Sequence, residues 1–171
     1  ACKSGETKIV KLLLELCNSE ESGLNIKDKI YGRTPFMIAC INGHKDVVKL
    51  FLDHSEPTIE LNARDNNGWT AFMNACRRGH KDIVQLLQNN SDRIELNKTA
   101  LIVACQEGHK DVVQLLLDYS GSNIDLNANA FIWACKEDHI DIIQLFLDRS
   151  PRIDLNARTN FGGTALMWAC E

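Results

Sequence analysis

The sequence predicts an all-α solenoid of stacked helix-turn-helix units, and two observations lead to this fold class. The first is a recurring motif, which is most complete where the run TPFMIAC at 34–40 is followed by Gly43 and His44. The second is its period, since the alanines at the shared position are 38, 36, 29, 30 and 35 residues apart. These alanines are Ala1, Ala39, Ala75, Ala104, Ala134 and Ala169. A repeat of this length indicates a solenoid, because each unit buries its apolar face only against its neighbours.

The first helix of a unit is predicted from its two ends and its apolar face. Thr34 can cap the helix by accepting from a first-turn N–H, and Pro35 then takes the first helical position, where its missing N–H costs nothing. Gly43 is placed to end the helix with a positive φ. Between these ends, three apolar residues fall on one face at i, i+3 and i+4: Phe36, Ala39 and Cys40.

A second helix and a turn complete the unit. The chain returns at His44 and enters a second helix with an apolar side. That side contains Val47, Val48, Leu50, Phe51 and Leu52. The run RDNNGW at 64–69 is typical of a turn, because Asp, Asn and Gly adopt the dihedral angles that turns require. Each full unit therefore reads as turn, helix, turn, helix and loop.

Two central units are short in the turn segment. The interval from a recurring asparagine to the next predicted helix is 8 residues after Asn62, but 2 residues after Asn97 and 2 after Asn127. Both units therefore lack the projecting turn, which we call a finger, while their helices are intact. Either the chain has a deletion at these two places, or the sequence omits residues there; the spacing fits both interpretations.

The run TPFMIACINGHKDVVKLFLD at 34–53 and its partial copies resemble the ankyrin-repeat family over essentially the whole chain. Pro35 is the only proline of the family's T-P-L-H core, and its histidine is replaced throughout. The replacing residues are Met37, Met73, Ile102, Ile132 and Met167. The resemblance implies a single array over 1–171, with about four complete units in 34–156 and partial units at both ends. Because no polar capping unit is visible, we expect a segment of a longer protein.

Composition and charge argue against several classes of function. Apolar residues make up 44% of the chain, and its net charge of −4 is not that of a nucleic-acid-binding face. No apolar run approaches the roughly 18 residues of a membrane span. Walker, G-x-S-x-G and G-x-G-x-x-G motifs are missing from the sequence. We therefore expect no catalysis, no cofactor, no nucleic-acid, membrane or small-molecule partner, and a monomer unless exposed ends associate. The densest basic cluster is Arg64, Arg77, Arg78 and Lys81. We interpret it as a solvated surface; the alternative is a contact for an acidic peptide.

The cysteines predict a reducing compartment. Six of the seven occupy the same repeat position, where a thiol buried against neighbouring units behaves as a small apolar group. These six are Cys2, Cys40, Cys76, Cys105, Cys135 and Cys170; the seventh is Cys17. Equivalent cysteines should lie about one repeat apart, which is too far for a disulfide. We therefore expect reduced thiols and an intracellular protein, cytoplasmic or nuclear.

Four Cys–His pairs with a spacing of four raise the hypothesis of a zinc site. The pairs are Cys40 with His44, Cys76 with His80, Cys105 with His109 and Cys135 with His139. A glycine, or Asp138 in the last pair, interrupts the helix between the partners, and four copies in register favour hydrogen bonds that tie adjacent units. No metal is therefore predicted. His54 lies outside this pattern and is expected to be exposed. Turn-forming hydrogen bonds are expected for the recurring loop asparagines Asn25, Asn62, Asn97, Asn127 and Asn156.

The family resemblance implies a protein-binding surface on the fingers and on the exposed side of each first helix. Carried over by position, this surface comprises Tyr31, Arg33, Asn66, Asn67, Trp69, Arg77, Arg78, Lys98, Gln106, Glu107, Lys136, Glu137, Asn160 and Phe161. These positions vary from unit to unit, whereas the helix interiors do not. Tyr31, Trp69 and Phe161 are candidate anchors, because interfaces favour large aromatic residues; alternatively, each ring shields its own unit. Trp133 and Trp168 lie inside first helices and are expected to pack, although a tryptophan can also line a groove.

The sequence thus predicts a protein–protein interaction module, a scaffold or adaptor, that binds a protein partner of unknown identity without catalysis. Two other hypotheses stay open. The chain could be a regulatory or substrate-targeting segment of a larger enzyme, such as a kinase or a ubiquitin ligase, or it could be a structural spacer. The full reading frame would identify the first, and fingers that tolerate any substitution would favour the second.

Overall fold

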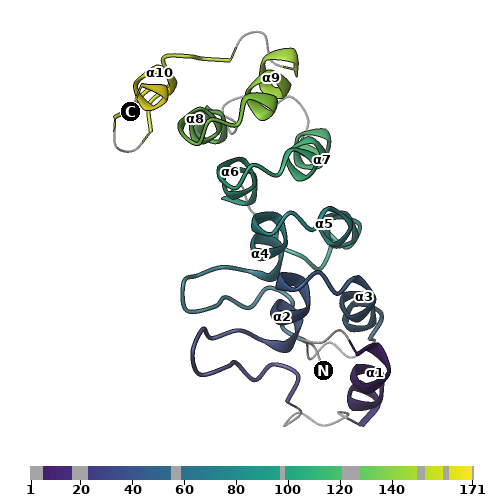
Figure 1. Cartoon of the computed structure of the whole chain (residues 1–171). Coiled ribbons are helices and arrows are strands. Elements are labelled where there is room, and N and C mark those ends of the chain that lie inside the picture. Colours follow the sequence, from purple (N-terminus) through teal and green to yellow (C-terminus); the bar gives the residue numbers. More distant parts are fainter. Residues whose placement is uncertain are drawn as a thin grey trace. The chain divides into compact units, whose positions relative to one another are not determined.

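In a computed structural model, the described residues are 6–16, 23–54, 59–96, 99–120, 128–149, 153–159 and 162–170. All regular secondary structure within these ranges is α-helical (Figure 1). The helices are α1 (Thr7–Leu16), α2 (Pro35–Ile41), α3 (Lys45–Asp53), α4 (Ala71–Arg77), α5 (Lys81–Gln88), α6 (Thr99–Gln106), α7 (Lys110–Ser120), α8 (Ala128–Lys136), α9 (Ile140–Arg149) and α10 (Ala165–Ala169).

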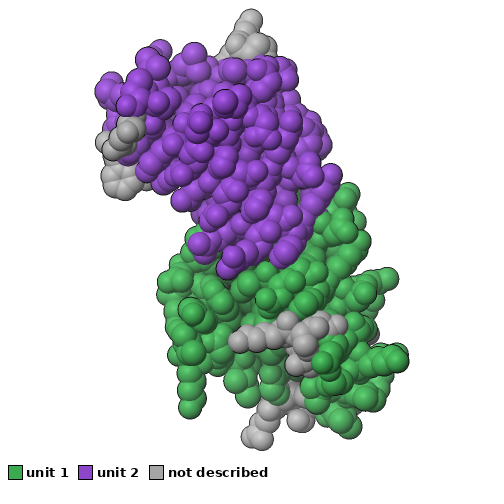
Figure 2. Space-filling model, in the orientation of Figure 1, with its two compact units in different colours: residues 1–75, 82–96 green, residues 76–81, 97–171 purple. Residues whose placement is uncertain are grey.

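The chain divides into two compact units, which Figure 2 distinguishes by colour. Unit 1 consists of residues 1–75 and 82–96, and unit 2 consists of residues 76–81 and 97–171. Unit 1 contains α1, α2 and α3, and unit 2 contains α6 to α10, while α4 and α5 contribute residues to both. The helices pack in successive pairs, α2 with α3, α6 with α7 and α8 with α9, as expected for helix-turn-helix repeats.

The first helix of a repeat begins where its sequence predicts. At α2, the Thr34 hydroxyl accepts a hydrogen bond of 3.3 Å from the Met37 backbone N–H, and Pro35 is the first helical residue. The threonines that precede α4 and α10 cap those helices in the same way. Gly43 follows α2 with a φ of 77°, and Asp138 follows α8 with a φ of 57°. The left-handed conformation therefore recurs after both helices, although the residue type differs.

Phe36 from α2 and Phe51 from α3 lie at the centre of unit 1. Their rings meet edge to face with centroids 5.7 Å apart, and the two residues are 0% and 2% exposed. Ala39 and Cys40 complete the buried face of α2, which confirms the predicted i, i+3, i+4 pattern. Unit 2 repeats this arrangement with Phe131 and Phe146 at 5.9 Å.

The cysteines follow the predicted burial at three positions but not at the end of the chain. Cys40, Cys76 and Cys105 are buried, Cys135 is half-buried and Cys170 is exposed. The prediction is wrong for Cys170, because no described element packs over the end of α10. Burial raises the pKa of the three buried thiols, since their surroundings disfavour the thiolate. Cys2 and Cys17 lie outside the described residues.

His54 is half-buried, so the prediction that it is exposed is also wrong. It is the residue that ends α3, and its backbone N–H donates a hydrogen bond of 3.1 Å to the Leu50 carbonyl. Its ring atom Nε2 is buried, so surrounding residues cover part of the imidazole.

Candidate protein-binding surface

The first finger of unit 1 is a hairpin that Asp28 organises before α2. The Asp28 backbone N–H donates to the Arg33 carbonyl at 2.9 Å. Its carboxylate accepts hydrogen bonds from three backbone N–H groups, those of Tyr31 at 2.7 Å, Ile30 at 3.0 Å and Arg33 at 3.2 Å. These bonds, the one from Tyr31 foremost, hold the pKa of Asp28 below its usual value. The tip of the finger is therefore fixed by its own backbone.

The second finger, before α4, is built in the same way around Asp65. Its backbone N–H donates to the Trp69 carbonyl at 3.0 Å, and its carboxylate accepts from the N–H groups of Asn67 at 2.9 Å and Trp69 at 3.0 Å. Gly68 closes the turn with a φ of 79°, and its N–H donates to the Asp65 carbonyl at 2.9 Å. The run at 64–69 thus forms the turn that its sequence predicts.

The two fingers of unit 1 are bonded to each other and lie side by side (Figure 1). Asn66 of the second finger donates from its backbone N–H to the Tyr31 carbonyl at 2.9 Å and from its side chain to the Ile30 carbonyl at 3.2 Å. Gly32 leaves room for the Asn66 side chain, which a Cβ at residue 32 would overlap. Asn66 therefore joins the fingers, and only part of its side chain remains available to a partner.

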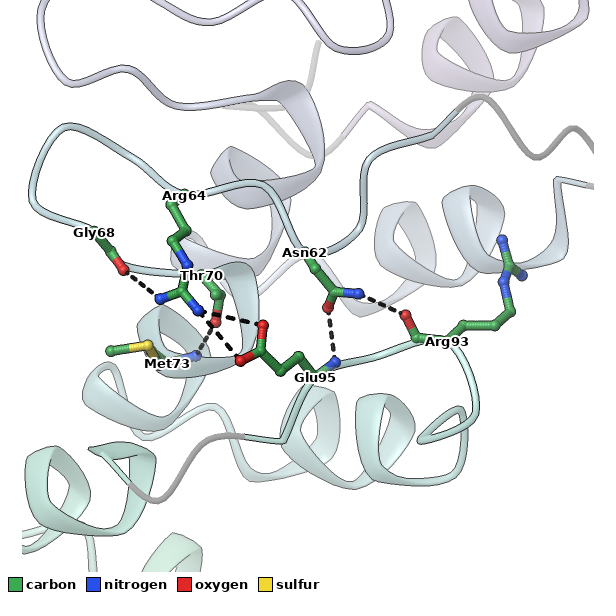
Figure 3. Close-up of polar contacts among 7 residues, drawn as sticks. All are labelled: Asn62, Arg64, Gly68, Thr70, Met73, Arg93 and Glu95. Carbon is green, nitrogen blue, oxygen red and sulfur yellow. Dashed lines mark hydrogen bonds and ion pairs between the residues drawn. The ribbon is translucent and has the colours of Figure 1, made fainter.

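Polar side chains also tie the base of the second finger to the loop that follows α5 (Figure 3). Arg64 donates to the Gly68 carbonyl at 3.1 Å and forms an ion pair with the Glu95 carboxylate at 3.2 Å. The Asn62 side chain donates to the Arg93 carbonyl at 2.9 Å and accepts from the Glu95 backbone N–H at 2.7 Å. The finger is thus held at its base as well as along its side.

The prediction that the recurring asparagines stabilise their own turns is wrong for Asn62, and Asn25 also reaches beyond its own turn. The Asn25 side chain accepts a hydrogen bond of 2.9 Å from the Glu60 backbone N–H, which lies one repeat further along the chain. Asn62 makes the equivalent bond to Glu95. Both asparagines therefore link successive loops, because stacking brings the next loop within reach of the side chain. Asn97 and Asn127 lie outside the described residues.

Replacement of Asn62 by alanine should lower the free energy of unfolding by about 1 kcal/mol, because two hydrogen bonds at an exposed site are exchanged for bonds to water. Urea denaturation measures this loss, and hydrogen exchange should show reduced protection of the Glu95 amide. Asn67→Ala is the matched control, since Asn67 is exposed at the finger tip, and its stability should change by less than about 0.5 kcal/mol. Equal stability of the two variants would contradict a linking role for Asn62.

The finger tips of unit 1 expose large side chains. Ile30 is 76% exposed and Tyr31 is 51% exposed. The Arg33 guanidinium lies over the Tyr31 ring, 4.2 Å from its centroid, which restricts the motion of both side chains. Trp69 is half-buried, so its ring partly shields its own unit and partly remains accessible. Tyr31, Arg33, Asn66, Asn67 and Trp69 therefore come from two bonded fingers of one unit.

The remaining described candidates lie on unit 2. Arg77, at the end of α4, forms an ion pair of 3.0 Å with Glu107, beyond the end of α6. Arg78 and Glu137 are exposed. The basic cluster predicted as solvated is therefore partly paired, because Arg64 and Arg77 each hold a carboxylate of the next repeat. Three candidates lie outside the described residues: Lys98, Asn160 and Phe161.

Two histidines of the Cys–His pairs, His109 and His139, tie successive repeats, as predicted. In unit 2, His109 Nε2 lies 2.8 Å from the Arg77 carbonyl oxygen, and His139 Nε2 lies 3.1 Å from the Gln106 carbonyl oxygen. A carbonyl oxygen only accepts, so Nε2 carries the proton in both rings. Within the described ranges, no group of three or more His, Cys, Asp or Glu residues is placed to hold a metal ion.

Unit 2 also carries a groove of about 180 Å³ that the sequence did not indicate. Its lining residues come from α6, α8, the segment before α10 and α10 itself: Ile102, Asn129, Ile132, Trp133, Lys136, Thr159 and Trp168. Lys136 Nζ lies 4.8 Å from the Trp133 ring centroid and 4.6 Å from that of Trp168. Trp133 and Trp168 are half-buried, so they do more than pack. The repeat equivalence of the two tryptophans is visible in the sequence, but the position of the lysine between them is not.

The repeated helix pairs, caps and fingers are those of a helical repeat array. Matches to the family described as ankyrin repeats (3 copies) cover residues 1–96, 57–128 and 101–171. The chain belongs to the ankyrin-repeat family, and its fold is an ankyrin-type solenoid of helical units. Ankyrin repeats are protein–protein interaction modules, generally without catalysis.

A solved structure with the same fold is the ankyrin repeat domain of Bcl-3, a member of the IκB protein family. It matches with a TM-score of 0.76 and 24% sequence identity, over 99% of this chain and 75% of that chain. No curated protein sequence matches this chain. In the described part of the chain, none of the helices is both long enough and apolar enough to span a membrane.

Proposed function

We propose that this chain is a non-catalytic interaction module that binds a protein partner through the finger tips of unit 1 and the exposed side of its first helices. The observation that carries the proposal is the exposure of Ile30 and Tyr31 on a braced hairpin. A large apolar side chain on a flexible loop can fold back onto its own protein, whereas Asp28 and Asn66 hold this tip in place.

The rigidity of the fingers supports a binding role on energetic grounds. Ordering a mobile loop or a long side chain on binding costs affinity, and a preformed surface avoids much of that cost. The backbone bonds of Asp28 and Asp65, and the Arg33 guanidinium over the Tyr31 ring, meet this requirement before any partner arrives. Tyrosine and arginine are also the residues that most often dominate interface energetics.

Replacement of Tyr31 by alanine should weaken partner binding at least about tenfold without unfolding the chain, because the ring is exposed and outside the core. The measurement is quantitative affinity purification of partners from source cells with the original chain and with the variant. The matched control is Tyr119→Ala, because Tyr119 is 54% exposed on α7 of unit 2 and belongs to neither finger.

The expected outcome is a protein that both the original chain and Tyr119→Ala retain and that Tyr31→Ala loses, with equal helical circular dichroism for all three. An identical set of proteins for the original chain and both variants would exclude the finger tips as the contact surface.

We also propose that the protein lies inside the cell, in the cytoplasm or nucleus. The support for this placement is that Cys40, Cys76 and Cys105 are free, buried thiols.

A further inference from the structure

The size of the groove on unit 2 limits its occupant. Its volume is about 180 Å³. Sites for cofactors and comparable ligands span roughly 300–1,000 Å³. The groove therefore has room for one large side chain and its immediate neighbour, and its walls of Ile132, Trp133 and Trp168 suit an apolar group.

Lys136 is the one charged residue among those that line the groove. Its ammonium lies over two indole rings, 4.8 Å from the Trp133 centroid and 4.6 Å from the Trp168 centroid, which favours this position of the long side chain. Among the described residues, no carboxylate forms an ion pair with it. An indole face attracts the positive charge but accepts hydrogen bonds poorly, so donors of this ammonium remain available to an anionic acceptor.

We propose that this groove binds an acidic, hydrophobic peptide segment of the protein partner. One large apolar side chain of that segment packs on the apolar lining of the groove beside Lys136, and the carboxylate of an adjacent Asp or Glu accepts hydrogen bonds from Lys136 Nζ. The inference rests on the proposed function, because it assigns the chemistry of one part of the partner. The two rings favour this position of the Lys136 side chain, so less side-chain freedom is lost on binding.

Charge favours this occupant over a basic peptide. A partner lysine or arginine would be repelled, because the Lys136 ammonium already occupies the space between the aromatic faces.

Peptide selection on the whole chain tests the proposal. A random library of twelve-residue peptides is selected, and enriched peptides are titrated by fluorescence polarisation against the original chain and three variants. Lys136→Met keeps the unbranched side chain but removes the charge, and Lys136→Glu reverses it. Lys110→Met is the matched control, because Lys110 is an exposed lysine on α7 that does not line the groove.

We expect enriched peptides to carry Asp or Glu beside Leu, Ile, Phe or Trp. Lys136→Met should weaken them about fivefold, and Lys110→Met should leave their affinity unchanged. Lys136→Glu should weaken them further, and substitution of lysine for the peptide acid should restore binding to this variant. Selection of basic peptides, failure to enrich any peptide, or equal affinity for the original chain and both Lys136 variants would overturn the proposal.

The partner experiment separates this proposal from the proposed function. If Tyr31→Ala loses a partner that Lys136→Met retains at the level of the original chain, the proposed finger surface is supported and the proposed acidic-peptide groove is contradicted. A partner set that neither substitution changes would count against both.

Discussion

Replacement of Phe36 by alanine should lower the free energy of unfolding of unit 1 by about 3–5 kcal/mol. The side chain is completely buried and meets the Phe51 ring edge to face, so truncation removes both the apolar burial and the ring contact. The cavity cannot close easily, because Phe36 lies in the first turn of α2, whose start is fixed by the Thr34 cap, and the next residue, Met37, is also buried. A total stability of 5–15 kcal/mol is typical, so this one substitution should remove much of the stability of the unit.

Urea denaturation measures this effect, with Trp69 as the fluorescent reporter of unit 1. Trp133 and Trp168, which belong to unit 2, are replaced by phenylalanine in the reference protein so that one tryptophan remains. Tyr31→Ala is the matched control, because it truncates an aromatic residue that is 51% exposed, and it should cost less than about 0.5 kcal/mol. A similar loss for both variants would mean that Phe36 is not a core residue.

The helices and their ends could be predicted from the sequence, because their determinants are local. Thr34, Pro35 and Gly43 act within one turn of the helix that they begin or end, and the structure places all three as expected. Burial of Phe36 and Cys40 followed from spacing, since neighbouring repeats cover the same face each time. Local rules were sufficient here because each repeat packs mainly on the repeats adjacent to it.

The candidate site could be predicted only in part, because it depends on which groups stacking brings together. The recurrence of Asn25 and Asn62 was visible, but their acceptors and donors lie in the next loop, and spacing alone does not identify them. The position of the Lys136 ammonium is a sharper case. It is set by one ring on its own helix and by a second ring on α10, some 30 residues away in the sequence. The sequence pattern does not predict where the end of a long side chain such as Lys136 lies.

Asp138 shows where a sequence pattern and a conformation differ. It interrupts the Gly-His motif, but its φ of 57° is in the same left-handed region as that of Gly108, at 75°. Aspartate tolerates this region better than most residues. The repeat therefore requires a left-handed backbone at this position in each copy, and a close approach to histidine adds a second requirement at Gly79 and Gly108.

Replacement of Gly108 by alanine should therefore destabilise unit 2 by about 2–4 kcal/mol, from two separate causes. Alanine in the left-handed region costs about 1–2 kcal/mol. The new Cβ would also lie 2.5 Å from Cε1 of the His139 ring, which must move and lose its hydrogen bond to the Gln106 carbonyl, at a further cost of about 1 kcal/mol or more. Urea denaturation followed by circular dichroism measures the total.

The two causes can be separated by a control and a double-mutant cycle. Gly162 has a φ of 79° with no described atom within 4 Å of an added Cβ, so Gly162→Ala should show the backbone cost alone. His139→Ala removes the ring that the new Cβ would meet. Gly108→Ala made in the His139→Ala background should therefore cost only the backbone part. Additive losses in the cycle would show that Gly108 and His139 do not interact. The repeat would then need glycine at 108 for its conformation alone, and the histidine tie would be independent of it.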